Sequence, residues 1–490
     1  MTIEVYSDDC ELILGLVAPV GVDLETVIRS LKSYFQQFNY EVNLIHLSQV
    51  AQQSQDEVLS SSNEVTRLDS GMDTGDNLRD KHKRGDFYSL LAIQEINKSR
   101  EIENNQQTPF SRRVHIIRSL KHPDEVQTLR QVYGHGFFLL GITNTIEKRI
   151  EYLTEEKGVP ETEVERLIQR DDKEKGDFGQ NTRGVFQMAD AFIQSGLQST
   201  SKQIGRFLDL LFSSPKIFPT ADEYAMFMAY TASLRSADLS RQVGAVLAND
   251  HQDIIATGAN DVPKYGGGLY WPDDDDKRDY KKGYDSNEKE RDKILLNIMR
   301  KLDSSDSKDD SELIKSGKIL LKDTGILGIT EYGRAVHAEM EALMSASRNG
   351  TPTRNSTLYT TTYPCHNCAK HIIAAGVKKV KYIEPYPKSY AKILHGDEIE
   401  DTGLEAESSN KVIFEPFVGI GPRRFVDLFS LSLSSGRQVR RKINGRLASW
   451  DRLTSNLRVP LSPLSYIEAE AKVIAEFTSE LPTEEEQADV

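Results

Sequence analysis

The first half of the chain alternates short apolar runs with amphipathic stretches. Apolar runs of this length between turn residues predict buried strands, and they cover 11–18 (ELILGLVA), 40–47, 113–118 (RVHIIR) and 136–143 (GFFLLGIT). From Asp23, DLETVIRSLKSYFQQF has helical periodicity and predicts a helix with an aspartate at its start. EVQTLRQVYG predicts another helix, closed by Gly134. Strands alternating with helices predict a parallel sheet in a three-layer domain.

Two parts of this half carry weaker patterns. The polar stretch from Ala51 to Leu78 has few large apolar residues and predicts either a surface loop or a pair of helices. From Ile146 to Leu210 the chain is charged and predicted to be helical. SSPKIFPT at 213–220 then supplies two prolines before a new pattern begins. We therefore assign 1–212 to an N-terminal domain and begin the second domain at Asp222.

The second half returns to strands and helices around a charged interruption. A helix over 223–237 leads into strands at 243–249 and 253–260, and the pattern resumes with a helix over 331–348, a strand over 356–363, a helix over 365–375 and a strand over 377–383. Between them, about 263–323 is rich in mixed charge and predicts a solvated insertion. We assign 222–436 to the second domain. A basic stretch and an acidic tail, with one predicted helix, form 437–490.

Length and charge narrow the class of protein. A chain of 490 residues exceeds one compact domain, and its 38% hydrophobic and 28% charged residues are typical of a soluble globular protein. The net charge of -14 argues against chain-wide affinity for nucleic acid or an anionic membrane surface. The N-terminus lacks a signal-peptide pattern, and no uncharged run approaches the roughly 18 apolar residues of a membrane helix. We expect a cytoplasmic protein with no membrane association.

The cysteines and one histidine indicate a metal site. Cys10, Cys365 and Cys368 are too few for a disulfide framework, and the last two form a C-x-x-C pair typical of metal or redox chemistry. His337 and Glu339 lie upstream, with 24 residues between Glu339 and the P-C-x-x-C segment. One histidine and two thiolates suit Zn²⁺ and leave a fourth position for water. The sequence therefore predicts one zinc ion per chain, held by His337, Cys365 and Cys368.

The predicted elements place these residues at helix starts. Pro364 fits the first turn of a helix, so both cysteines would lie at a helix N-terminus, where the dipole stabilises thiolate. His337 and Glu339 would diverge by about 200° inside a regular helix, so we expect them where the helix begins. Glu339 is then free to take a proton from zinc-activated water and deliver it to a ring nitrogen and a departing amine. This chemistry is hydrolytic deamination.

The motif and its surroundings resemble a known superfamily. H-x-E followed by P-C-x-x-C is the signature of zinc-dependent base deaminases. Residues from 222 to about 424 resemble the deoxycytidylate deaminase branch of the cytidine deaminase superfamily, notably in SLRSADLSRQVGAVL and IIATGAN. The whole chain, with its P-loop kinase-like start, YWP insertion, EPYPKS and FEPFVGIGPRR, is similar to the bacterial anti-phage dCTP deaminases.

This resemblance carries expectations of fold, activity and assembly. It implies a mixed sheet of about five strands flanked by helices, a homo-oligomer, and deamination of dCTP, and often dCMP, to the deoxyuridine nucleotide, which depletes a phage's precursor pool. Asn260 matches the asparagine that contacts the deoxyribose in the family.

Candidate substrate contacts flank the zinc helix. Tyr363 could stack on a pyrimidine or pack in the core as a strand tyrosine, and the sequence leaves both open. Lys388 and Ser389 in EPYPKS, and Arg423 and Arg424 after the glycines of VGIGP, are candidates for triphosphate contacts.

The start of the chain carries a degenerate phosphate loop. GLVAPVGVD, with Gly15 and Gly21, resembles G-x-x-x-x-G-K-[ST], but Leu16 replaces the first glycine, and Val22 and Asp23 stand where the lysine and hydroxyl belong. Val22 lacks the charge and Asp23 would repel phosphate, so we predict no phosphotransfer and either a nucleotide sensor or a structural domain. Four basic residues could contact a nucleotide there or simply lie on the surface: Arg118, Lys121, Arg130 and Arg149.

Several functions remain open at this point. The chain could deaminate free deoxycytidine nucleotides, either in defence against phage or as a housekeeping dCMP deaminase with a nucleotide-sensing N-terminal domain. A polynucleotide-editing deaminase would need a basic groove with aromatic residues, and the net acidity opposes it. The run 437–446, with four Arg and one Lys, could bind an RNA regulator or form a solvated face.

Overall fold

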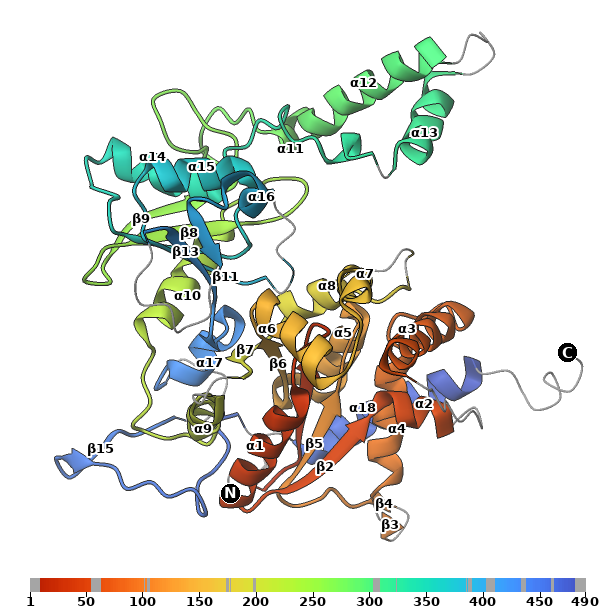
Figure 1. The fold of residues 1–490 in the computed structure, drawn as a ribbon. Helices are drawn as coiled ribbons and strands as arrows, with labels where there is room; N and C mark the ends of the chain where they lie inside the picture. The colour runs from red at the N-terminus through yellow and green to blue at the C-terminus, as the bar shows by residue number, and fades with distance from the viewer. Residues whose placement is uncertain are drawn as a thin grey trace, which may run out of the picture.

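The structure is a computed structural model that describes residues 9–53, 63–100, 102–103, 106–172, 176, 178–196, 200–302, 309–322, 324–384, 386, 390–401, 410–432, 438–459 and 462–480. These residues form two six-stranded sheets with flanking helices and two small hairpins, β3 (Ile102–Glu103) with β4 (Gln106–Gln107) and β15 (Lys442–Ile443) with β16 (Arg446–Leu447) (Figure 1). The predicted α/β fold class is confirmed.

The N-terminal sheet has the order β14-β7-β6-β1-β5-β2. Its strands are β1 (Leu12–Val17), β2 (Glu41–His46), β5 (Arg113–Arg118), β6 (Phe137–Thr143), β7 (Ala191–Gln194) and β14 (Gly419–Ile420). Among these strands only β14 is antiparallel to its neighbour, and the other pairings are parallel. All six residues of the central β1 are buried, as expected for a parallel sheet covered on both faces.

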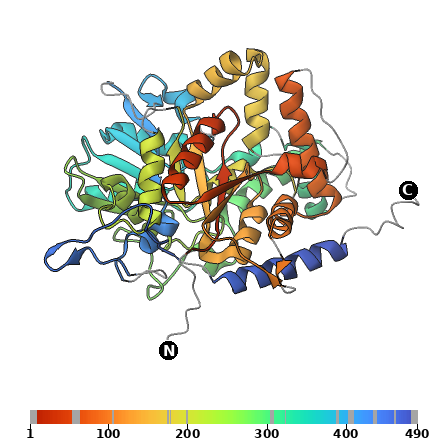
Figure 2. The same ribbon diagram turned by 90° about the horizontal axis from the view of Figure 1, so that it is seen from below.

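Helices surround this sheet. They are α1 (Leu24–Gln37), α2 (Leu47–Gln53), α3 (Glu64–Lys81), α4 (Phe87–Lys98), α5 (Pro123–Tyr133), α6 (Ile146–Glu151), α7 (Glu161–Asp172), α8 (Thr182–Gln187), α9 (Thr200–Leu211) and α18 (Pro463–Glu480). The predicted ends of two helices are confirmed: Asp23 caps α1, and Gly134 ends α5. α18, from the far end of the chain, packs against α4 and α5 (Figure 2).

The structure decides the two weaker sequence patterns of this half. Of the alternatives for 51–78, the described part forms the helices α2 and α3. The prediction that 146–210 is helical throughout is wrong at β7, because AFIQ is a fully buried strand that extends the parallel sheet beside β6.

The C-terminal sheet has the order β12-β13-β11-β10-β8-β9, so it has six strands rather than about five. Its strands are β8 (Gly244–Ala248), β9 (Ile254–Ala259), β10 (Thr357–Thr360), β11 (Lys379–Tyr382), β12 (Ile399–Asp401) and β13 (Val412–Pro416). β8 is antiparallel to β9 and β10, whereas β10, β11, β13 and β12 run parallel. The sheet is therefore mixed, as the resemblance implied.

Helices cover both faces of the C-terminal sheet. On one face, α10 (Ala221–Ser233) packs in a core that is continuous with that of the N-terminal sheet. On the other face, α14 (Ala338–Arg348) and α15 (His366–Ala374) pack over Leu247 and Leu358 in a second core. The short helices α16 (Ala391–His395) and α17 (Phe425–Phe429) complete this half. The first of these cores thus extends across both halves, and β14 and α18 return to the N-terminal half from beyond residue 400.

The charged insertion is largely helical. It contains α11 (Asp279–Lys282) and a hairpin of α12 (Ser286–Leu302) and α13 (Asp310–Leu320), which extends away from the C-terminal sheet in Figure 1. The prediction of a wholly solvated segment is wrong at Arg278, which is buried because its guanidinium donates to Asp261 (3.0 Å) and Asp276 (2.7 Å). This contact ties the insertion to the end of β9.

Candidate metal centre

Two helix N-termini meet at the carboxyl end of β10. His337 is the N-cap of α14, Glu339 lies in its first turn, and Cys365 is the N-cap of α15. The prediction that His337 and Glu339 lie where a helix begins is confirmed. The prediction of a helix from 331 is wrong, because the backbone at Val336 instead pairs with Asp261 in an isolated antiparallel bridge. Pro364 lies just before the N-cap of α15 rather than within its first turn.

The three predicted ligands converge. Nδ1 of His337 lies 3.3 Å from Sγ of Cys365 and 3.4 Å from Sγ of Cys368. Their ligand atoms all lie within 4.8 Å of one another. Tetrahedral zinc, with bonds of about 2.3 Å to sulfur and 2.0 Å to nitrogen, would place N and S about 3.5 Å apart. The residues present therefore fit one zinc ion, as predicted from the sequence.

Burial and the hydrogen bonds within the cluster control the charge of these groups. The Cys368 thiol and then His337 stabilise the Cys365 thiolate and, against the effect of burial, lower the pKa of Cys365 to about 3. The hydrogen bond between Cys368 and Cys365, together with burial, raises the pKa of Cys368. Burial also raises the pKa of Glu339, whose Oε2 accepts from Sγ of Cys368 at 3.4 Å. The site therefore combines a thiolate, suited to a dication, with a buried carboxyl that can exchange a proton.

The centre is held by close packing that the sequence patterns did not single out. A Cβ on Gly258 of β9 would lie 2.1 Å from the carbonyl oxygen of Ala338 and 2.4 Å from the amide nitrogen of Ala342. Only a glycine lets β9 approach the first turn of α14 this closely. A glycine inside a strand pattern is a signal for such an approach.

Asn260 and Tyr363 border the centre with their polar groups engaged. Oδ1 of Asn260 accepts from the amide of Val243 at 2.6 Å, and Nδ2 donates to the carbonyl of Arg241 at 2.8 Å. Asn260 therefore fixes the turn before β8, and its predicted sugar contact stays a prediction. The Tyr363 ring packs edge-on to Tyr382, with centroids 4.7 Å apart, which favours the core alternative.

The predicted triphosphate contacts do not gather here. The 3-10 helix of Pro422–Arg424 packs against α10, on the opposite face of the C-terminal sheet from α14 and α15. Arg424 is buried and donates to the carbonyl of Phe137 at 2.8 Å. Its assignment as a substrate contact is therefore wrong, because β14 carries it into the N-terminal sheet. Arg423 is exposed on the same short helix. Lys388 and Ser389 lie outside the described residues.

At the degenerate phosphate loop, a side chain of the protein itself occupies the N-terminus of the following helix. Gly15 lies inside β1, and Gly21 has a φ of 87° in the turn that follows. Val22 is buried. The Asp23 carboxylate accepts from the amides of Glu25 at 3.0 Å and of Thr26 at 3.2 Å, so it occupies the N-terminus of α1.

The four basic residues predicted to contact a nucleotide at this loop have partners within the chain. Arg118 pairs with Glu25, Lys121 with Asp171, Arg130 with Asp190, and Nε of Arg149 donates to the Val20 carbonyl. Val20, Arg118 and Lys121 line a cavity of about 500 Å³ beside the loop.

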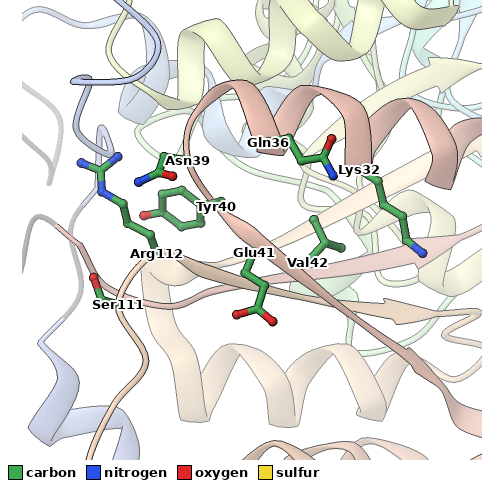
Figure 3. Close-up of a pocket in the computed structure, with 8 residues that line it drawn as sticks. All are labelled: Lys32, Gln36, Asn39, Tyr40, Glu41, Val42, Ser111 and Arg112. Atoms are coloured by element: carbon green, nitrogen blue, oxygen red, sulfur yellow. The ribbon is translucent and has the colours of Figure 1, made fainter.

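A second cavity, of about 590 Å³, lies at the opposite edge of the N-terminal sheet, between the end of α1 and the start of β2 (Figure 3). Its Tyr40 hydroxyl donates to the carbonyl of Cys10 at 3.1 Å. Its Arg112 donates to Asp9 at 2.6 Å and to the carbonyl of Phe38 at 3.1 Å. These polar groups therefore hold the sheet edge together, and none of the predicted site residues lies among them.

The basic run near the end of the chain lies in part on the β15–β16 hairpin. Lys442 and Arg446 are exposed there, while the Arg441 guanidinium stacks over Phe218 at 4.4 Å from the ring centroid. The two alternatives for this run, an RNA regulator or a solvated face, both stay predictions. Among the helices of the described part of the chain, none is both long and apolar enough to span a lipid bilayer.

Comparison with known proteins finds a family match within the C-terminal half of the chain. Residues 219–384 match the family model of the cytidine and deoxycytidylate deaminase zinc-binding region. This range includes all three candidate ligands and Glu339. The predicted resemblance of this half to the cytidine deaminase superfamily is therefore confirmed. The P-loop kinase-like and anti-phage parts of the resemblance stay predictions.

Curated relatives match this same half of the chain. ComE operon protein 2 of Bacillus subtilis is 43% identical over 72 residues, which is 14% of this chain and 38% of that protein. Deoxycytidylate deaminase of Enterobacteria phage T4 is 37% identical over 83 residues, 16% of this chain and 43% of that protein. The Homo sapiens deoxycytidylate deaminase is 27% identical over 161 residues, which is 33% of this chain and 63% of that protein. The chain thus spans less than two thirds of these relatives.

Solved structures align with part of the chain at low overall similarity. The dCMP deaminase from the cyanophage S-TIM5, in complex with dCMP and dUMP, is 19% identical and aligns with 41% of this chain and 100% of its own, at a TM-score of 0.23. Shikimate kinase from Acinetobacter baumannii is 11% identical and aligns with 42% and 96%, at a TM-score of 0.26. The α/β fold class is shown by the two six-stranded sheets of the chain itself.

Proposed function

We propose that the chain is a zinc-dependent hydrolytic deaminase of free deoxycytidine nucleotides, with dCTP preferred and dCMP also accepted. The observation that carries the proposal is the cluster of His337, Cys365 and Cys368 with the buried Glu339 carboxyl 3.4 Å from Sγ of Cys368. Three ligands leave room for a water molecule in a tetrahedral site, which is the arrangement of a catalytic zinc. Bound zinc supplies the chemistry of an activated water.

Glu339 would act as the proton carrier. Its carboxyl lies beside the ligands without being one, so it can take a proton from the attacking water and pass it to N3 of the pyrimidine. A further proton transfer to the amino group lets the C4–N bond break. Water and the cytosine ring are thereby converted into the uracil ring and ammonia. The match of residues 219–384 to the deaminase zinc-binding region supports this assignment.

Charge supports a free nucleotide as the substrate. The chain carries a net charge of -14, which repels a polyanion along its length. A local cation is available, since Arg241 is exposed and its charge acts on His337. One nucleotide phosphate group could pair with it. In defence against phage, this activity would lower the dCTP pool available for phage replication.

The test incubates purified protein with dCTP, dCMP and a cytosine-containing single strand and measures the uracil product. We expect dCTP to be consumed fastest and the strand to be left intact. Preference for dCMP would favour a housekeeping deaminase, and efficient conversion of the strand would favour an editing enzyme. The mass in solution, measured by light scattering, would test the homo-oligomer that the resemblance implies.

A matched pair of variants tests the role of Glu339. Glu339→Gln should keep zinc but lose about 10² to 10⁴-fold in rate, because general acid and base catalysis is worth that much. Glu312→Gln, on the exposed surface of α13, serves as the control. A Glu339→Gln protein with wild-type turnover would transfer the proton-carrying role to another residue.

A further inference from the structure

The degenerate phosphate loop has an occupant, and it comes from the protein itself. The carboxylate of Asp171, at the end of α7, is almost fully buried beside the loop. Five donors converge on it: the Val20 amide (2.7 Å), Lys121 Nζ (2.6 Å), Gln180 Nε2 (3.4 Å), Thr182 Oγ1 (3.3 Å) and the Tyr386 hydroxyl. A backbone amide of the loop and a lysine are groups that would otherwise hold a phosphate. Asp171 therefore fills the position of a bound anion.

One of those five donors comes from the other half of the chain. Tyr386 follows β11 of the C-terminal sheet and is buried against the N-terminal domain. The Val20 amide lies 3.3 Å from its hydroxyl, and the Arg149 guanidinium stacks over its ring at 4.8 Å from the centroid. Its hydroxyl and ring are thus both held by the loop region.

A second N-terminal residue holds the same segment. Arg183 of α8 donates through Nη2 to the carbonyl of Tyr386, and its Nε lies 3.1 Å from the carboxylate of Glu384. Gln187 donates to the same carboxylate at 3.4 Å. Glu384 and Tyr386, which follow β11, are therefore fixed by the N-terminal domain through side chain and backbone alike.

Strand pairing and ring packing connect this segment to the metal centre. Tyr382, the last residue of β11, is paired with Thr360 of β10, and its ring contacts that of Tyr363, which precedes Cys365 by two residues. A displacement of the segment after β11 would be transmitted through this packing to the N-terminus of α15.

We propose that the Asp171 carboxylate occupies the anion-binding position of the degenerate phosphate loop, which we call the anion socket. We further propose that the hydrogen bond from Tyr386 to this carboxylate positions the metal centre for deamination. Tyr386 is a positioning residue, and the N-terminal domain acts on the reaction by holding it. The proposal rests on the proposed deaminase function for its kinetic consequence. The occupied socket itself is a separate, directly measurable property.

The kinetic test uses variants that remove the contact and keep the shape. Tyr386→Phe deletes the hydroxyl and keeps the ring under Arg149, and Asp171→Asn removes the charge. Each should lower kcat for dCTP by about 10-fold to 10²-fold, with KM and zinc content near wild type, since small misplacements of reacting groups have effects of this size. Tyr265→Phe, at a fully exposed tyrosine, is the control. Wild-type kcat in both socket variants would overturn the positioning role.

Two further measurements do not depend on activity. Hydrogen–deuterium exchange in the first turn of α15 should be faster in Tyr386→Phe than in wild type or the control. Tripolyphosphate, followed by calorimetry, should bind Asp171→Asn at least about 10-fold more tightly than wild type, because a carboxylate no longer competes for Lys121. Equal tripolyphosphate binding by both proteins, or unchanged exchange in α15, would overturn the proposal. If no cytosine nucleotide is deaminated by wild type, only the proposed function fails.

Discussion

Replacement of Gly258 by alanine tests how the metal centre is held. Gly258 lies in β9, directly against the first turn of α14, which carries His337 at its N-cap and Glu339 in its first turn. The added Cβ would meet the carbonyl oxygen of Ala338 at 2.1 Å and the amide nitrogen of Ala342 at 2.4 Å. Both are backbone atoms, which cannot rotate away as a flexible side chain would.

The size of the effect follows from these distances. Ordinary van der Waals contact begins at 3.4 Å, so relief of the 2.1 Å contact requires α14 to move by 3.4 minus 2.1, or about 1.3 Å. Overpacking of this kind destabilises a core by about 1 to 3 kcal/mol. A misplacement of about 1 Å at a reacting group lowers a rate by about 10²-fold. We therefore expect Gly258→Ala to lose about 3 kcal/mol of stability, about 10²-fold in kcat/KM, and zinc affinity.

The assay compares Gly258→Ala with Gly328→Ala. Gly328 has no heavy atom within 4 Å of an added Cβ, so its variant should stay within about 0.5 kcal/mol of wild type. Urea unfolding gives the stability, zinc per chain after dialysis against a weak chelator gives the metal affinity, and dCTP turnover gives the rate. A Gly258→Ala protein with wild-type values of all three would refute the reasoning that β9 sets the position of α14.

Three further predictions concern the ligands, one buried acid and the phosphate loop. The double variant Cys365→Ser, Cys368→Ser should hold almost no zinc by mass spectrometry, and full occupancy would refute the ligand assignment. Burial, against the attraction of Arg183, raises the pKa of Glu384 to about 7 from 4.5. Its folded state thus binds the proton more tightly, so it contributes stability at low pH that is lost as pH rises from about 4.5 to 7. Urea unfolding at pH 5 and pH 7.5 measures this loss of stability, and Glu384→Gln should reduce it by up to about 3 kcal/mol. An equal loss of stability between the two pH values in both proteins would contradict the raised pKa. Wild type should transfer no phosphate from ATP to a nucleotide, because the Asp23 carboxylate occupies the N-terminus of α1; nucleotide kinase activity that disappears in Asp23→Ala would overturn this.

Local sequence features determined the elements and the metal ligands. The apolar run at 11–18 is a buried strand, and Asp23 caps the helix after it, because caps and periodicity act within a few residues. His337, Cys365 and Cys368 could be identified as one site because few residue types bind zinc and their spacing fits two helix starts.

The tertiary structure decided which of the remaining charged and aromatic residues meet. Arg424 follows a glycine-rich turn that suits phosphate, yet β14 carries it into the N-terminal sheet, where it binds the Phe137 carbonyl. Tyr386 belongs to the C-terminal half by sequence and is buried in the N-terminal one, beside Asp171. Such contacts depend on how the two halves of the chain pack against each other. A single sequence encodes that packing through many weak contacts at long range and not through a local pattern.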